Sequence, residues 1–204
     1  MFEARPFRVE RAAPEHGAAL ATLLSTNGFG CYCRYWHFDA NHREWLARCA
    51  HAPDDNRAEL LAAVAARSGE ASGMVALDAS DELVGWLKLA PAPLMGKLYG
   101  QRLYKGLPCL ERDATGVWTV GCLFVREDLR RRGAATALLA GAIHSAAEAG
   151  VRALEAFPRS DVDVAAAALM MGPLALFLRA GFEVVHDFTP YPVLRLDLDR
   201  KAAA

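Results

Sequence analysis

The spacing of apolar residues in the first third of the chain predicts three helices. Leucines between residues 20 and 24 recur with helical spacing after Pro14, so a helix should begin at that proline and end at the Asn-Gly pair of residues 27–28. Helical patterns follow around residues 41–49 and again from Asn56, a predicted N-cap with a glutamate three residues further on.

Alternating and β-rich apolar runs predict the strands of this part of the chain. Residues 7–9 form a short candidate, and residues 71–77 and 83–89 are predicted as a hairpin across a polar turn. Residues 117–125 are apolar on both faces, which is typical of a central strand. The Gly-, Pro-, Tyr- and Lys-rich segment before that strand indicates only a short helix around residues 97–104.

The last third of the chain alternates helices with strands. Small residues fill a predicted helix over 133–149, a strand follows at 152–157, and a second helix is expected over 173–180. Residues 184–188 and 193–198 are predicted as a final pair of strands. This order, after a hairpin, implies an α/β fold whose mixed sheet is covered by helices on both faces.

Composition limits the class of protein. The 204 residues suit a single domain, and no repeat, low-complexity tract or linker divides residues 1–204. A net charge of −1 argues against a general nucleic-acid binder, and five cysteines do not form a secreted disulfide framework. The N-terminus lacks the apolar core of a signal peptide, and the longest uncharged run, residues 164–178, is too short to span a bilayer. We therefore expect a cytoplasmic protein without membrane or nucleic-acid partners.

The most informative stretch joins the strand predicted at 117–125 to the helix predicted at 133–149. It reads Arg130-Arg131-Arg132-Gly133-Ala134-Ala135-Thr136. The start of a helix carries backbone N–H groups without partners and the positive end of the helix dipole. Arginines add charge there, and Gly133 allows a ligand to approach the backbone closely. This combination predicts a binding site for a diphosphate group.

These residues resemble the coenzyme A signature of the GCN5-related N-acetyltransferases (GNAT), which is Arg or Gln, two residues, Gly, one residue, then Gly or Ala. Residues 130–135 match it position by position, after a hydrophobic strand end at residues 123–125. A second block, residues 176–184, resembles the family's late helix running into Gly-Phe-Glu-Val. The N-terminal half resembles a subgroup with a Cys-x-Cys-x-x-Trp segment at residues 31–36 and a Gly-Trp strand at residues 85–86.

The resemblance implies a mostly antiparallel seven-stranded sheet that splays between its fourth strand (117–125) and its fifth (152–157). The pantetheine arm of coenzyme A would lie in the splay. Residues 116–200 would form the coenzyme A-binding half, and residues 1–115 the acceptor side. The backbone amide of Leu123 is implied as a catalytic donor to the oxyanion. The implied cofactor-binding residues are Leu123, Phe124, Val125, Arg130, Arg131, Arg132, Gly133, Ala134, Ala135 and Thr136.

One position departs from the family pattern. Members commonly use a tyrosine, four residues before the Gly of Gly-Phe, as general acid, and this chain has Phe177 there. A phenyl ring cannot donate a proton. Catalysis is still feasible, because a thiolate with a pKa of about 8.5 is a tolerable leaving group that water can protonate. Tyr191 is a candidate substitute acid.

Glu155 is the predicted catalytic base or amine-binding carboxylate. It lies in the middle of a predicted strand, where a charge is costly unless it faces a cleft. The alternative is a half-buried glutamate paired with an arginine such as Arg152. Asp161 and Asp163 follow in a loop and either attract a cationic acceptor or form an ordinary turn or helix cap.

The aromatic segment of residues 29–38 is predicted as a loop that walls the acceptor pocket. Its Cys33 and Trp36, together with Tyr191, are the candidate substrate-binding residues. Cys122 either lies near the thioester or is a small buried residue. A zinc site is the alternative for the cysteines and histidines Cys31, Cys33, His37, His42, Cys49 and His51. Only one residue separates the first two cysteines, whereas structural zinc sites favour two to four, so no metal is expected.

Together these features predict an enzyme that moves an acetyl group from acetyl-CoA to a primary amine of a small acceptor, by direct attack in a ternary complex. The missing tyrosine leaves a second possibility, a coenzyme A- or acetyl-CoA-binding sensor or partner module without turnover. A third is an acyltransferase that uses longer acyl chains or an oxygen acceptor. The resemblance also allows a homodimer.

Overall fold

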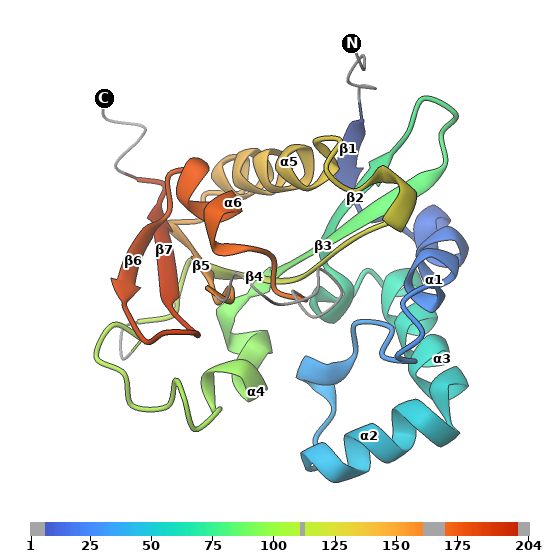
Figure 1. The fold of residues 1–204 in the computed structure, drawn as a ribbon, viewed down its shortest axis with the longest axis horizontal. Helices are drawn as coiled ribbons and strands as arrows, with labels where there is room; N and C mark the ends of the chain where they lie inside the picture. The colour runs from blue at the N-terminus through green and yellow to red at the C-terminus, as the bar shows by residue number, and fades with distance from the viewer. Residues whose placement is uncertain (1–6, 111–112, 161–169, 200–204) are drawn as a thin grey trace.

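A seven-stranded sheet forms the centre of the computed structural model, which describes residues 7–110, 113–160 and 170–199 (Figure 1). The strand order is β1-β2-β3-β4-β5-β7-β6. The β4–β5 pair is parallel and the other pairs are antiparallel, which confirms the predicted mixed sheet. The strands are β1 (Arg8–Arg11), β2 (Gly73–Leu77), β3 (Leu83–Pro91), β4 (Val117–Val125), β5 (Ala153–Ala156), β6 (Glu183–His186) and β7 (Val193–Asp197).

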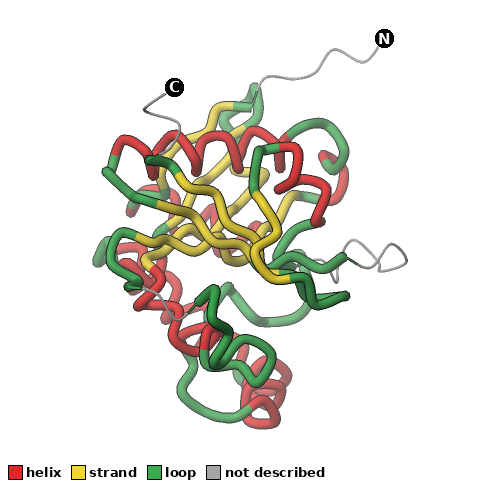
Figure 2. Tube along the Cα trace, turned by 90° about the vertical axis from the view of Figure 1, so that its left-hand side faces the viewer, coloured by secondary structure: helices red, strands yellow, loops and turns green. Residues whose placement is uncertain are grey.

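Helices cover both faces of the sheet. In Figures 1 and 2 the helices α5 and α6 lie on one side of the strands, and α1 to α4 lie on the other. The α-helices are α1 (Gly17–Ser25), α2 (His42–His51), α3 (Pro53–Ala65), α4 (Gly96–Tyr99), α5 (Ala134–Glu148) and α6 (Leu174–Arg179). One-turn 3₁₀ helices lie at Pro14–His16, Tyr35–His37, Gly69–Ala71, Ala92–Met95 and Glu127–Leu129. Among the described residues, no helix combines the length and apolarity needed to cross a membrane.

The core on the α5 side explains the small residues of that helix. Leu138 and Leu139 are almost fully buried against the sheet, and burial of a leucine stabilises a fold by roughly 1.5–3 kcal/mol. A Cβ atom added at Gly141 would come within 2.6 Å of Val9, so the helix approaches β1 too closely for a larger residue. The opposite face has its own core, in which α1 and α3 pack against Trp86 of β3.

The prediction that a helix begins at Asn56 is wrong. Helix α3 starts at Pro53, with acidic residues in its first turn, so the proline supplies the start signal. Asn56 lies inside the helix, fully buried, and its side-chain amide donates to the carbonyl of Gly30 at 2.8 Å. It therefore ties α3 to the aromatic loop. The helix predicted at 97–104 is shorter than expected, because α4 ends at Tyr99.

The sheet opens on one side of β4. β5 pairs with the first four residues of β4, Val117–Val120, and its last paired residue is Ala156. The pairing of β3 with β4 continues beyond this point, with an irregularity between Leu87 and Leu89. The second half of β4 thus keeps β3 as a neighbouring strand, while on its other edge the amide of Leu123 donates to the carbonyl of Met170.

Candidate functional site

The loop between β4 and α5 is built to receive an anion. Arg131 and Gly133 adopt left-handed backbone angles, with φ of 60° and 93°, and Gly133 is the N-cap of α5. None of the described side chains caps the helix. Within the described part of the chain, the amides of Ala134, Ala135 and Thr136 donate to no acceptor. These free donors lie at the positive end of a fifteen-residue helix dipole.

Gly133 has a conformation and surroundings that fit close ligand approach. A Cβ atom placed on it would have no heavy atom within 4 Å beyond its chain neighbours, so no other described residue fills the space above its backbone. Arg130 is half-buried, and its Nε donates to the carbonyl of Val125 at 3.2 Å. Arg131 and Arg132 are exposed. The guanidinium groups therefore add positive charge around the loop while the backbone supplies the directed donors.

The amide of Leu123 lies on the open edge of β4. It donates to the carbonyl of Met170 at 2.8 Å, so the predicted oxyanion donor has a protein partner. Leu123, Phe124 and Val125 line a cavity of about 230 Å³ together with Arg130. Arg130 is the one residue of the predicted loop 130–136 that lines this cavity in the described structure, whereas Thr136 lines a separate cavity between α5 and α6.

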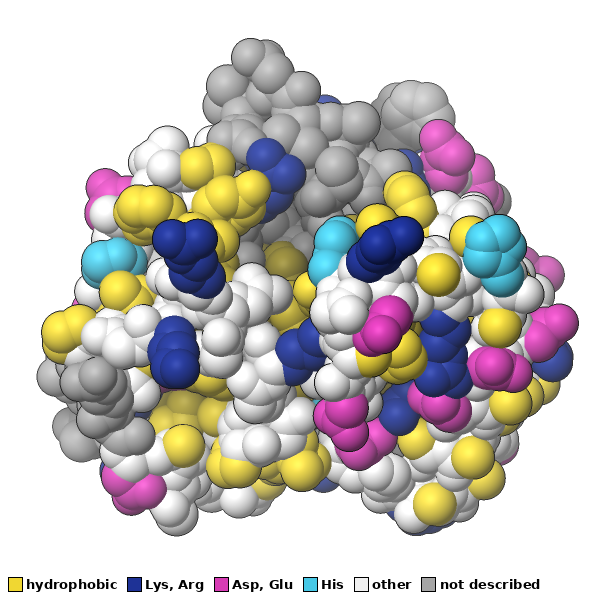
Figure 3. Space-filling view, turned by 90° about the horizontal axis from the view of Figure 1, so that it is seen from below, with side chains coloured by type: hydrophobic (Ala, Val, Ile, Leu, Met, Phe, Trp, Pro, Cys, Tyr) yellow, Lys and Arg dark blue, Asp and Glu magenta, His cyan; other side chains and the backbone are white. Residues whose placement is uncertain are grey.

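The predicted acceptor residues lie in two adjacent cavities. Cys33 lines the cavity that contains Leu123. Trp36 and Tyr191 line a second cavity, of about 280 Å³, whose walls include Tyr104 and Phe157. Met170 lines both cavities, so it lies between them. Figure 3, which views the molecule from the side of α2 and α4, shows the surface hollowed between its left and right parts.

One residue that lines the second cavity carries a buried donor without a partner among the described residues. The indole Nε1 of Trp36 is buried and forms no hydrogen bond with the described residues. Tyr191 lies under the guanidinium of Arg159, 5.3 Å from its ring centroid. Burial raises the pKa of Tyr104 to about 12, so its hydroxyl stays protonated at neutral pH. The cavity is therefore aromatic, with hydrogen-bond donors at its edge.

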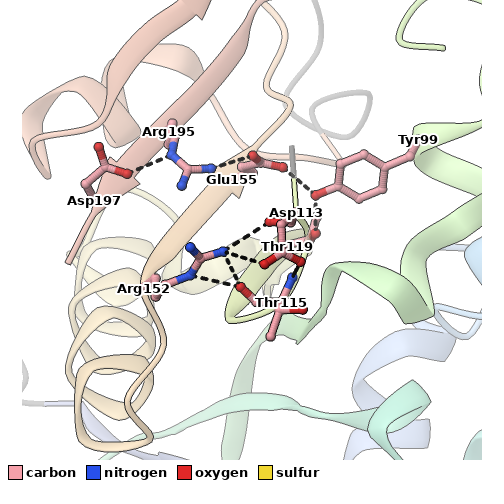
Figure 4. A network of polar contacts seen from close by, with 8 residues as sticks. All are labelled: Tyr99, Asp113, Thr115, Thr119, Arg152, Glu155, Arg195 and Asp197. Carbon is pink, nitrogen blue, oxygen red and sulfur yellow. Dashed lines mark hydrogen bonds and ion pairs between the residues drawn. The ribbon is translucent and has the colours of Figure 1, made fainter. Parts of the chain in front are cut away.

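Glu155 takes part in a buried ion pair (Figure 4). Its carboxylate accepts from Arg195 of β7 at 2.8 Å and from the hydroxyl of Tyr99 at 2.7 Å, and only 5% of the residue is exposed. Burial, helped by the Glu155 charge, raises the pKa of Tyr99 well above its usual range, so Tyr99 is the donor. Arg152, the partner considered from the sequence, bonds instead to the carbonyl oxygens of Asp113 and Thr115.

The position of Glu155 separates it from the opening of β4. Glu155 pairs in register with Thr119, which comes four residues before Leu123. Four residues of an extended strand span about 13 Å, so Glu155 is that far along β4 from Leu123.

Phe177 is fully buried in α6 and packs edge-on against Phe182, with ring centroids 5.4 Å apart. It is a core residue and has no proton to give. Asp161 and Asp163 lie outside the described residues.

Two cysteines meet beside the opening. The Sγ of Cys33 accepts the indole N–H of Trp86 at 3.3 Å, and the Cys122 thiol lies beside it. The interaction with Cys122 more than offsets burial and lowers the pKa of Cys33, and the charge of buried Lys88 acts in the same direction. The same interaction, together with burial, raises the pKa of Cys122. Of the two thiols, Cys33 is therefore the one that deprotonates more readily.

Sequence reasoning missed several of these partners. Tyr99 lies in the Gly-, Pro-, Tyr- and Lys-rich segment before β4, whose pattern indicated only a short helix. Met170 and Lys88 belong to no sequence motif. A signal was available for Lys88 alone, because it is a lysine within an otherwise apolar strand pattern. No disulfide bond joins any of the cysteines in the described residues. In the described ranges, no three His, Cys, Asp or Glu side chains are arranged to hold a metal ion.

Solved structures with low sequence identity share this fold. A GCN5-related N-acetyltransferase from Kribbella flavida has a TM-score of 0.55 and 17% identity, with 94% of this chain and 97% of that chain covered. The PaiA N-acetyltransferase from Thermoplasma acidophilum, in complex with coenzyme A, has a TM-score of 0.55, 11% identity and 94% and 99% coverage. YncA from Salmonella typhimurium, with acetyl-CoA, has a TM-score of 0.50, 14% identity and 95% coverage of both chains.

The sequence itself places the protein in a family. No curated protein matches it significantly. The model of the acetyltransferase (GNAT) family matches residues 33–172, which include the diphosphate loop, β4 and both cysteines of the thiol pair. The resemblance predicted from the two sequence blocks is confirmed. The chain belongs to the GNAT family of acetyltransferases.

Proposed function

We propose that this protein is an acetyl-CoA-dependent N-acetyltransferase that acts on a primary amine of a small acceptor, by direct attack in a ternary complex. The observation that carries the proposal is the uncapped N-terminus of α5, with Gly133 at φ 93°, beside the opening of β4. Coenzyme A and acetyl-CoA in the structures of PaiA and YncA support the choice of cosubstrate.

Each part of the opening has a role in this proposal. The amides of Gly133 to Thr136 bind the diphosphate, and the arginines of residues 130–132 add charge. The backbone of residues 123–125 pairs with the pantetheine arm. The amide of Leu123 stabilises the oxyanion, so the Met170 carbonyl has to release this donor when acetyl-CoA binds.

The proposal does not need a tyrosine at position 177. Loss of a general acid typically costs about 10²–10⁴ in rate, which leaves measurable turnover. Tyr191 lies in the cavity next to the opening and is the candidate donor. The sequence predicted Glu155 as the base or amine-binding carboxylate, but this proposal gives it a structural role instead. Arg195 and Tyr99 hold its carboxylate in a buried ion pair, about 13 Å along β4 from Leu123.

The aromatic cavity is the proposed acceptor site. Its walls favour an amine with a flat apolar body, because aromatic faces bind such groups by stacking and burial. The free indole N–H of Trp36 favours an acceptor that also carries a hydrogen-bond acceptor, since an unsatisfied buried donor gains most from a new partner.

Replacement of Trp36 by Phe tests this assignment. We expect the KM for the amine to rise about tenfold, the effect of losing about 1.4 kcal/mol, while the affinity for acetyl-CoA stays unchanged. Steady-state kinetics with varied amine, and calorimetry with acetyl-CoA, measure the two quantities. Leu103→Ala, in a neighbouring and more exposed wall of the cavity, is the control for general damage. Equal KM values in the wild type and Trp36→Phe would remove Trp36 from the acceptor site.

The reaction itself is tested by release of free coenzyme A thiol when protein, acetyl-CoA and a panel of amines are mixed. Aromatic and other flat amines should be turned over fastest. Binding of acetyl-CoA with no thiol release across the panel would instead favour the sensor, for which the buried Phe177 is the motivating feature.

A further inference from the structure

We propose that Cys33 is a self-acylation site, whose thiolate takes the acetyl group from acetyl-CoA in a reversible thioester exchange that needs no amine. The proposal rests on coenzyme A binding as proposed above and adds an activity to it. It concerns a nucleophile that amine transfer does not use.

The thiol pair shares a cavity with the predicted oxyanion donor. Cys33, Cys122 and Leu123 all line the cavity of about 230 Å³ at the open edge of β4. Cys122 directly precedes Leu123 in β4, and Cys33 lies beside Cys122. A thioester whose carbonyl oxygen bonds to the Leu123 amide would therefore lie next to both sulfur atoms.

The surroundings of Cys33 stabilise a thiolate. Its sulfur accepts from the Trp86 indole at 3.3 Å, and the Cys122 thiol and the Lys88 ammonium lie nearby. Lys88 is itself buried, with its Nζ on the carbonyl of Glu70 and its stem against Gly121. A buried cation together with a directed donor is the kind of environment that activates cysteine nucleophiles.

The backbone holds Cys33 in a costly conformation. Tyr32 and Cys33 both have left-handed backbone angles, with φ of 44° and 59°, and neither is glycine. Such residues persist only where the surrounding structure requires them, and they gather at functional sites. Here the conformation holds the thiol against β3 and β4.

The neighbouring thiol provides a contrast. Cys31 lines the same cavity, but burial raises its pKa to about 11, so it stays protonated and unreactive. Of the three thiols that line this cavity in the described residues, Cys33 is the one whose pKa is lowered. The predicted reactivity is therefore specific to one cysteine out of three.

The exchange is chemically balanced without a further reagent. The Sγ of Cys33 bonds to the acetyl carbon while the bond from that carbon to the coenzyme A sulfur breaks. The leaving thiolate takes the Cys122 proton, which solvent then replaces. One thioester is converted to another, so the equilibrium lies near unity. The acetylated fraction should consequently follow the ratio of acetyl-CoA to free coenzyme A.

Mass spectrometry of the full-length protein tests the proposal. The protein is incubated with acetyl-CoA without amine, quenched in acid and digested with trypsin. We expect one acetyl group on the peptide that spans Cys31 and Cys33, and fragmentation should place it on Cys33. Excess coenzyme A should remove it. Cys33→Ser should lose the label completely, and the matched control Cys31→Ser should keep it.

Calorimetry with acetyl-CoA distinguishes failure of the self-acylation proposal from failure of the proposed function. Binding heat without acetyl on Cys33 overturns the self-acylation proposal and leaves the proposed function intact. Acetyl groups found only on lysines, or on Cys33 but not removed by coenzyme A, overturn it as well. Absence of binding heat overturns both proposals together.

Discussion

Gly133→Glu should weaken acetyl-CoA binding about 100-fold or more, which corresponds to about 2.8 kcal/mol. Two effects combine. A Cβ in the left-handed region costs about 1–2 kcal/mol, and Gly133 has φ of 93°, so glutamate would move the loop away from the conformation that presents its amides. A carboxylate beside the free amides of Ala134 and Ala135 would occupy the anion site and repel the diphosphate. Isothermal titration calorimetry measures the change in Kd.

Gly150→Glu is a closely matched control. Gly150 follows the other end of α5, has φ of 69°, and also has no heavy atom within 4 Å of an added Cβ. The substitution introduces the same strain and charge away from the diphosphate loop, so affinity should be unchanged. Equal weakening in both variants would attribute the effect to damage of α5, and an unchanged Kd in Gly133→Glu would contradict the assignment of the loop.

Glu155→Gln should lower the free energy of unfolding by about 3 kcal/mol, because removal of one partner of a buried ion pair leaves the other charge uncompensated. Arg195 would retain Asp197, at 2.7 Å, which keeps the loss toward the lower end of the range. We expect kcat to change less than about tenfold, since Glu155 is held about 13 Å along β4 from Leu123. Urea unfolding and steady-state kinetics measure the two effects.

The double variant Glu155→Gln/Arg195→Leu should regain part of the lost stability, because it removes the charge that the single variant leaves unpaired. The catalytic role of Glu155 that the sequence predicted would have the opposite effects on kcat and on stability. If Glu155 is the base, kcat falls by about 10²–10⁴ in the single variant while stability changes little, and the double variant does not recover.

Local signals explain why parts of the fold were predictable. The bounds of β4 were predicted correctly, because a nine-residue apolar run ends at charged residues on one side and glycine on the other. Helix α5 differs by one residue at each end, since Gly133 and Gly150 mark its limits. The Asn56 error shows the limit of such signals. A capping-box spacing occurred by coincidence inside a helix that Pro53 begins, and burial against Gly30 decided the role of the asparagine.

The candidate-site residues also form two groups, one defined by a single contiguous segment and one that only the fold brings together. The diphosphate loop is contiguous in sequence, so its chemistry could be predicted before the fold was known. Glu155 and Arg195 are 40 residues apart and meet only because β5 pairs with β7. Cys33 and Cys122 meet only because the aromatic loop packs on the central strands. No pattern within one segment reports such contacts, so the ion pair and the thiol pair required the structure.

The central claim is that the N-terminus of α5 and the open edge of β4 hold the diphosphate and pantetheine of acetyl-CoA. Amide NMR spectra recorded during titration with acetyl-CoA test it most directly. The account predicts saturable shifts at Gly133, Ala135 and Thr136 and at Leu123, whose amide must exchange the Met170 carbonyl for the ligand. Saturable binding that shifts amides elsewhere and leaves these four unchanged would contradict it.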